Sequence, residues 1–105
     1  MNDEPKRICR TPTKDRDGVT RIPQWKFDTV RSAIISAVKE AGDTGLLFKD
    51  LPGAVKDRLS ADHLAKLGSV GWHTTTVKLE MEVAGELERI AGRGPQRLRL
   101  AKPAL

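Results

Sequence analysis

The polar and basic residues that could bind a partner lie in the last third of the chain, and their charge suits an acidic partner. Polar side chains occupy positions 73–76 and 78, near the start of an expected helix, and cations recur over positions 93–99. Imidazole and hydroxyl groups can contact base edges or phosphates, whereas Lys and Arg supply most of the sequence-independent affinity for DNA. The candidate DNA-binding residues are His73, Thr75, Thr76, Lys78, Arg93, Arg97 and Arg99.

The pattern over residues 71–100 predicts the elements that must position these side chains. A helix is expected from Trp72 to about Ala84, ended by Gly85. Residues 87–91 are expected to be extended, residues 92–95 to form a turn, and residues 96–100 to alternate between polar and apolar. A helix can fill a major groove while a basic hairpin lies along the phosphates beside it. We therefore expect the N-terminal turn of the helix to face double-stranded DNA and the hairpin arginines to contact its phosphates, with Leu98 and Leu100 anchoring the hairpin to the core.

The expected helix carries apolar groups on two opposite faces, which is unusual for a DNA-reading helix. Val77 and Met81 share one face, whereas Trp72, Leu79 and Val83 lie nearly opposite. Either the second face contacts another subunit, or the helix is sandwiched inside one domain with Trp72 covering it. We take Trp72, Leu79 and Val83 as candidate interface residues. The alternative function is thus a protein–protein interaction module without DNA binding.

Acidic residues in the C-terminal half of the candidate helix and just after it argue against tight, sequence-specific DNA binding. They would repel phosphate if they faced it. In the expected geometry they fall in the C-terminal half, which can point away from the backbone of a duplex. These residues are Glu80, Glu82, Glu86 and Glu88.

The preceding residues predict a scaffold of helices and one short strand. A first helix is expected from Pro23 to about Ala41, because Phe27, Val30, Ile34 and Val38 form an apolar stripe. Residues 46–48 are expected to be extended, residues 49–59 to form a second helix, and residues 61–67 to form a short linking helix capped by the preceding serine. The fold class is therefore α+β, with three main helices, a short linking helix and a small antiparallel sheet that includes a C-terminal hairpin.

The domain boundaries follow from composition. Residues 1–21 mix charge, Pro, Thr and Gly without periodicity and are expected to be a flexible N-terminal tail or arm. A groove-entering arm is conceivable, but an ordinary flexible or dimer-exchanging tail is favoured. Residues 22–102 are expected to form the domain, and residues 103–105 its C-terminal end.

The bulk composition narrows the class of protein. The 105 residues are 38% hydrophobic and carry a net charge of +5, so the core is small and a homodimer would add stability. Cys9 is the only cysteine, which fits a reducing cytoplasm. No apolar run approaches the ~18 residues needed to cross a membrane. We therefore expect a cytoplasmic protein without a membrane partner.

No set of residues predicts an enzyme, a metal site or a cofactor site. His63 and His73 lack the closely spaced partners that zinc requires. Cys9 lies in the expected tail, which is a poor place to preorganise a nucleophile. The run Gly92–Pro95 precedes a strand rather than a helix, so it is a hairpin tip and not a phosphate-binding loop.

The motif GWHTTTVKLEMEVAGELERIAGRGPQRLRL resembles a family of small uncharacterised bacterial winged-helix proteins. An aromatic residue follows Gly at the helix start, a Val-x-Leu run leads to Gly and a strand, and a Pro-x-Arg-Leu-Arg-like segment returns. Residues 18–22, followed by Lys26 and Phe27, are similar to the start of the same family. Residues 81–89 resemble the junction between the third helix and the wing of MarR-like regulators. The resemblance implies a winged helix-turn-helix and a dimeric, DNA-binding transcriptional regulator, although residues 60–71 stand where such regulators have a tight turn.

Overall fold

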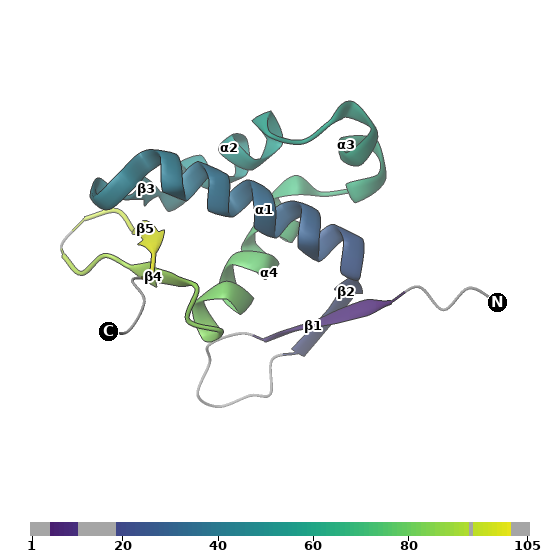
Figure 1. Ribbon diagram of the computed structural model, residues 1–105, viewed down its shortest axis with the longest axis horizontal. Helices are drawn as coiled ribbons and strands as arrows, with labels where there is room; N and C mark the ends of the chain where they lie inside the picture. Colours follow the sequence, from purple (N-terminus) through teal and green to yellow (C-terminus); the bar gives the residue numbers. More distant parts are fainter. Residues whose placement is uncertain (1–4, 11–18, 93, 102–105) are drawn as a thin grey trace.

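The computed structural model describes residues 5–10, 19–92 and 94–101, which form an α+β fold (Figure 1). The described part contains four α-helices, two short 3₁₀ turns and two small antiparallel sheets. In chain order the elements are β1 (Lys6–Arg10), β2 (Val19–Pro23), α1 (Gln24–Ala41), η1 (Gly42–Thr44), β3 (Leu46–Leu47), η2 (Phe48–Asp50), α2 (Leu51–Asp57), α3 (Ala61–Leu67), α4 (Val70–Val83), β4 (Leu87–Arg89) and β5 (Arg97–Leu100).

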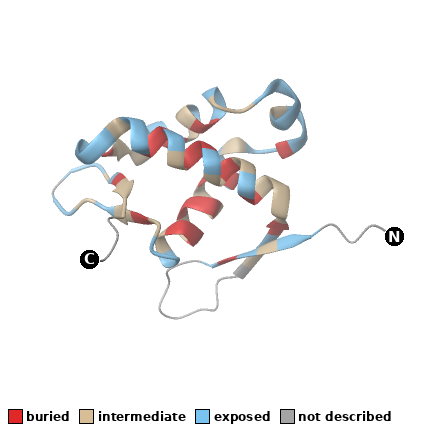
Figure 2. Ribbon diagram, in the orientation of Figure 1, coloured by how far each residue is buried: buried red, intermediate tan, exposed pale blue. Residues whose placement is uncertain are grey.

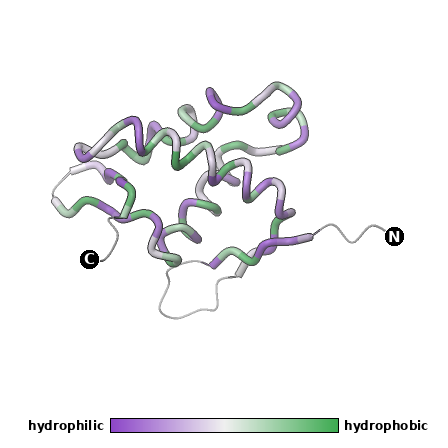
Figure 3. The backbone as a smooth tube through the Cα atoms, in the orientation of Figure 1, coloured by the Kyte–Doolittle hydropathy of each residue, from purple (hydrophilic) through white to green (hydrophobic). Residues whose placement is uncertain are grey.

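Helix α1 is the spine of the molecule, and its predicted bounds are confirmed to within one residue. Phe27, Val30, Ile34 and Val38 are at most 2% exposed. The helix packs on α4, α2 and β5, so a single apolar stripe serves three neighbours. Hydrophilic and hydrophobic colours alternate along it in Figure 3, as a helix with one buried face requires.

Helix α4 crosses beneath α1 and packs against it in the core (Figures 1 and 2). Val77 and Met81 are fully buried. The helix starts two residues before the predicted Trp72, because the Ser69 hydroxyl caps it by accepting a hydrogen bond from the Trp72 backbone N–H at 3.1 Å. Periodicity alone does not show where this cap lies.

The segment between β3 and α4 contains less α-helix than predicted. The expected helix over residues 49–59 begins as η2 and becomes α-helical only from Leu51 to Asp57. The cause is a tether, since the Phe48 N–H donates to the Gln96 carbonyl at 2.9 Å and extends the strand contact by one residue. The linking helix Ala61–Leu67 is confirmed, with the Ser60 hydroxyl accepting from the His63 N–H at 3.0 Å.

The C-terminal sheet has the strand order β3-β5-β4 and is antiparallel throughout. Leu46 lies opposite Leu98, and Leu87 opposite Leu100. Leu98 is fully buried and Leu100 packs against the core, which confirms that these two leucines anchor the hairpin. The turn between β4 and β5 includes residue 93, which lies outside the described residues.

The expectation of a flexible tail over residues 1–21 is wrong where the structure describes that segment. Strands β1 and β2 form a second hairpin, with Cys9 opposite Thr20. Cys9 and Ile22 are 1% and 2% exposed and belong to the core. Strand β1 could not be recognised in the sequence because most of its residues are charged. Its buried side packs against α4, which is distant in the chain. Residues 1–4, 11–18 and 102–105 lie outside the described residues.

Two further observations concern the described residues. None of their helices is both long and apolar enough to cross a bilayer. No group of three or more His, Cys, Asp or Glu side chains among them could hold a metal ion.

Candidate interaction surface

The Lys78 side chain points into the molecule, so the expectation that it faces a DNA groove is wrong. Only 2% of the side chain is exposed. Its Nζ lies 4.5 Å from the centre of the Phe48 ring, 3.1 Å from Gln96 Oε1 and 3.0 Å from Glu82 Oε2. Burial lowers the pKa of Lys78, and the neighbouring Glu82 opposes that shift. Lys78 therefore joins α4 to the C-terminal hairpin.

His73 is also turned inward, contrary to its predicted place at a groove. The residue is 8% exposed, and Nδ1 lies 2.7 Å from the Ser69 carbonyl oxygen, one turn earlier. Its ring meets the Trp72 ring edge-on, with centroids 4.8 Å apart. Thr75 and Thr76 stay at the surface and are half-buried. Of the four helix residues predicted to meet DNA, these two threonines alone remain accessible.

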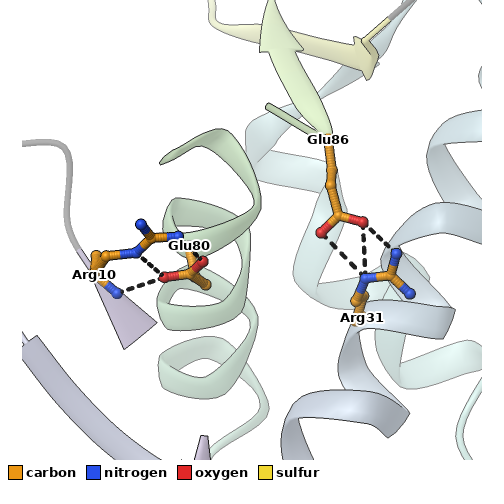
Figure 4. A network of polar contacts seen from close by, with 4 residues as sticks. All are labelled: Arg10, Arg31, Glu80 and Glu86. Atoms are coloured by element: carbon orange, nitrogen blue, oxygen red, sulfur yellow. Dashed lines mark hydrogen bonds and ion pairs between the residues drawn. The ribbon is translucent and has the colours of Figure 1, made fainter. Parts of the chain in front are cut away.

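Glu80 holds the N-terminal hairpin onto α4 (Figure 4). Its carboxylate accepts hydrogen bonds from the Arg10 backbone N–H at 2.9 Å, from Nε at 2.9 Å and from Nη2 at 2.7 Å. The Arg10 guanidinium holds the pKa of the Glu80 carboxyl below its ordinary value. The sequence suggested that this glutamate would repel phosphate, yet its side chain is 1% exposed. No local pattern signals the pair, because the partners are 70 residues apart.

Most described cations of the C-terminal hairpin are paired with glutamates. Arg99 Nε lies 2.5 Å from Glu88 Oε1, and Arg89 Nε lies 2.6 Å from Glu82 Oε1. Arg97 is exposed. The candidate Arg93 falls outside the described residues. The hairpin thus presents less uncompensated positive charge than its sequence indicates.

A second ion pair fixes the start of this hairpin to α1. Arg31 donates to Glu86 through Nε, at 3.0 Å from Oε2, and through Nη2 (Figure 4). The glutamates that were expected to oppose DNA binding are therefore structural partners of arginines.

The outer face of α4 is apolar and uncharged. Trp72 is 50% exposed and Val83 is 36% exposed, while Thr76 and Leu79 are half-buried. These four residues follow one another at steps of four, three and four, so they share one side of the helix. We call them the α4 stripe. Contact between the stripe and a second subunit was one of the two predicted explanations, and the half-exposed Trp72 does not fit the other, a helix sandwiched within one domain.

A hollow lies elsewhere on the described part of the molecule, and the one arginine on its wall is already paired. It has a volume of about 460 Å³ and runs between α1 and the segment joining α2 to α3. Arg58 on its wall donates to the Ser36 hydroxyl at 3.1 Å and to the Ala54 carbonyl at 3.0 Å, and it pairs with Glu40. At the neighbouring end, Trp25 stacks on His63 with centroids 5.8 Å apart. This hollow offers no unsatisfied charge to a ligand.

A protein-family model matches residues 7–98 of the chain. The chain belongs to a family of unknown function, DUF6958. The match runs from β1 to β5, so in this DUF6958 member the N-terminal hairpin belongs to the same unit as the helices. Among curated proteins and solved structures, no match is found.

Proposed function

We propose that this DUF6958 protein is a protein-interaction module that binds its partner through the α4 stripe. The observation that carries the proposal is the half-exposed Trp72, which lies on one helix face with Leu79 and Val83. Trp is enriched among the residues that dominate binding energies at protein interfaces. An apolar face left in water is a recognised mark of an interaction site.

The inward charges of α4 support the same proposal. Lys78 is engaged by Glu82 and Gln96, and Glu80 by Arg10, so both side chains brace the flanking hairpins. A helix that reads DNA needs polar groups on its outer side. On α4 the outer side offers the hydroxyls of Thr75 and Thr76 but no cation, and the Glu82 carboxylate is turned toward Lys78 and Arg89.

The order of elements supports a winged-helix arrangement for this module. The chain runs α1, β3, α2, α3, α4, β4 and β5. The short strand β3 pairs with the returning strand of the hairpin, as a winged helix is expected to have it. Because one fold serves many functions, this arrangement does not choose between a protein and DNA as the partner.

Site-specific photo-crosslinking in the cells that express the protein tests the proposal. A photoreactive amino acid at position 76, in the middle of the α4 stripe, is expected to give a discrete protein adduct. The same amino acid at Ala65, which is exposed on α3, serves as the matched control and is expected to give none. Val83→Glu should abolish the adduct at position 76. Equal adducts at both positions, or an adduct that survives Val83→Glu, would count against the proposal.

Duplex DNA is a second candidate partner, favoured by the exposed Arg97 and the net charge of +5. In this case the hairpin would act as a wing on the phosphates, as expected of a transcriptional regulator. Phosphate contacts from Arg93, Arg97 and Arg99 would give a slope of roughly −3 when the logarithm of the binding constant is plotted against the logarithm of the salt concentration. Arg97→Ala should reduce that slope by about 1, whereas Lys56→Ala on the exposed side of α2 should not. An electrophoretic shift with random duplex at two salt concentrations decides the matter, and no shift at low salt rejects this candidate.

A further inference from the structure

The partner of the α4 stripe can be specified further by the spacing of its residues. The steps from Trp72 to Thr76, to Leu79 and to Val83 are the steps between a and d positions of a coiled-coil heptad. A stripe of this kind packs against another helix, and it extends over 12 of the 14 residues of α4, about 18 Å. A partner that matches it must present a helix of similar length.

We propose that the partner is a second copy of this chain, whose α4 packs antiparallel to the first. This inference rests on the proposed function, since it names the occupant of the same surface. In an antiparallel pair each a position meets a d position of the other helix. Trp72 then packs on Val83 of the second copy, and Thr76 packs on Leu79 of the second copy. The contact is isologous, as a two-fold dimer requires.

The sizes of the side chains favour this antiparallel register. In this register Trp72 meets the smaller Val83 at each end of the contact. The four layers of side chains are therefore more nearly equal in volume than in a parallel pair. A parallel pair would place two Trp72 rings against each other at one end and two Val83 side chains at the other. The bulky and small layers would then be separated, and the helices would be forced apart at the Trp72 end.

The charge beside the stripe does not oppose the pairing of two copies. Glu82 flanks the stripe, but its side chain is only 10% exposed and its carboxylate is turned toward Lys78 and Arg89. The two Glu82 side chains lie at opposite ends of the contact and do not repel each other. Each stays compensated within its own chain by Arg89 and Lys78.

The small area of the stripe sets the expected affinity. A standard interface buries about 800 Å² on each partner. The stripe contributes half of one Trp side chain, a third of one Val and parts of Thr76 and Leu79, which is well below that area. We therefore expect a weak, concentration-dependent dimer, with a dissociation constant on the order of 10–100 µM.

Sedimentation equilibrium of the full chain tests the dimer directly. The wild-type protein should pass from monomer to dimer between about 1 and 500 µM. Leu79→Glu should weaken the association at least about tenfold, because it buries a charge in the middle layer. The control Ala65→Glu adds the same charge on α3 and should leave the dimer intact, and circular dichroism verifies that both variants stay folded. A wild-type protein that remains monomeric at 500 µM overturns the inference.

Disulfide trapping tests the register. Trp72→Cys mixed with Val83→Cys should give a crosslinked heterodimer under mild oxidation, whereas Trp72→Cys alone should not. The reverse result, with Trp72→Cys crosslinking to itself, would overturn the antiparallel register. Wild-type protein is the background control, because Cys9 is buried and burial raises the pKa of its thiol to about 11.

The two proposals can fail separately. If position 76 crosslinks in cells to a different protein and the purified chain stays monomeric, the interaction module stands and the second copy is rejected. If position 76 gives no adduct and the chain is monomeric, both are rejected. A self-adduct at position 76 together with a concentration-dependent dimer supports both.

Discussion

Glu80 on α4 and Arg10 on β1 are joined by three hydrogen bonds across 70 residues of sequence. One of the donors is the backbone N–H of Arg10, so the carboxylate holds the strand itself and not only the guanidinium. Glu80 is 1% exposed while Arg10 is 52% exposed. The Arg10 side chain therefore covers Glu80 on the solvent side of α4. We expect the stability of the N-terminal hairpin to depend on this pair.

Replacing Glu80 by Ala should lower the free energy of unfolding by about 1–3 kcal/mol, because a buried acceptor for three donors is lost. The double variant with Arg10→Ala should be no less stable than Glu80→Ala alone, since the two side chains act as a unit. Urea denaturation of the three variants measures this coupling. The control Glu40→Ala removes a carboxylate that is 76% exposed and pairs with Arg58, and should cost less than about 1 kcal/mol. Additive losses at Arg10 and Glu80 would contradict the coupling.

The same pair predicts a loss of stability in acid. The pKa of Glu80 is lower in the folded protein than in the unfolded chain, chiefly through the side-chain hydrogen bond from Arg10. The pair therefore stabilises the fold fully above the ordinary pKa of a Glu, about 4.3, and this contribution is lost as the pH falls through the lower, folded value. Urea midpoints measured between pH 7 and pH 3 should fall less steeply in Glu80→Gln than in the wild type. The exposed-site control Asp57→Asn should keep the wild-type slope.

Lys78→Met should preserve the fold, with a change in unfolding free energy within about 1.5 kcal/mol, because Met fills the space over Phe48 and Glu82 keeps its pair with Arg89. Lys78→Ala should cost about 2–4 kcal/mol through the cavity that it leaves. If the protein shifts duplex DNA at all, Lys78→Met should shift it as the wild type does, since this lysine lies inside. A selective loss of DNA binding in Lys78→Met would show that Lys78 reaches the duplex.

Gly45→Ala should destabilise the junction between α1 and the C-terminal sheet by about 2–3 kcal/mol. Gly45 has a φ of +81°, and an added Cβ would lie 2.5 Å from Ile90 Cδ1 and 3.0 Å from the Leu98 carbonyl oxygen. Gly42→Ala is the matched control, because Gly42 has a φ of +70° but open space around its Cα. This control should lose only about 1–2 kcal/mol of unfolding free energy, which is the cost of a positive φ for a residue that has a Cβ. Equal losses of thermal stability in the two variants would show that the close approach at Gly45 has no effect.

Much of the fold was predictable because its signals are local. The stripe Phe27, Val30, Ile34 and Val38 defined α1, and Ser60 marked the start of α3. The alternation of residues 96–100 predicted β5 and its buried Leu98. Each of these features depends on neighbours within one or two turns of the chain, so periodicity and capping are sufficient to place it.

The sequence named Trp72, Leu79 and Val83 as candidates but could not decide which face of α4 is exposed, because α4 has apolar residues on both faces and periodicity cannot say which face is buried. Tertiary packing decided it: Val77 and Met81 meet α1 and α2, and the opposite side with Trp72 is left outside. The same packing turned Lys78 and Glu80 inward, because their partners Gln96 and Arg10 come from distant hairpins. The sequence determined which segments are helices and strands. Contacts between residues far apart in the chain decided which charged side chains are paired inside the molecule and which face of α4 stays exposed.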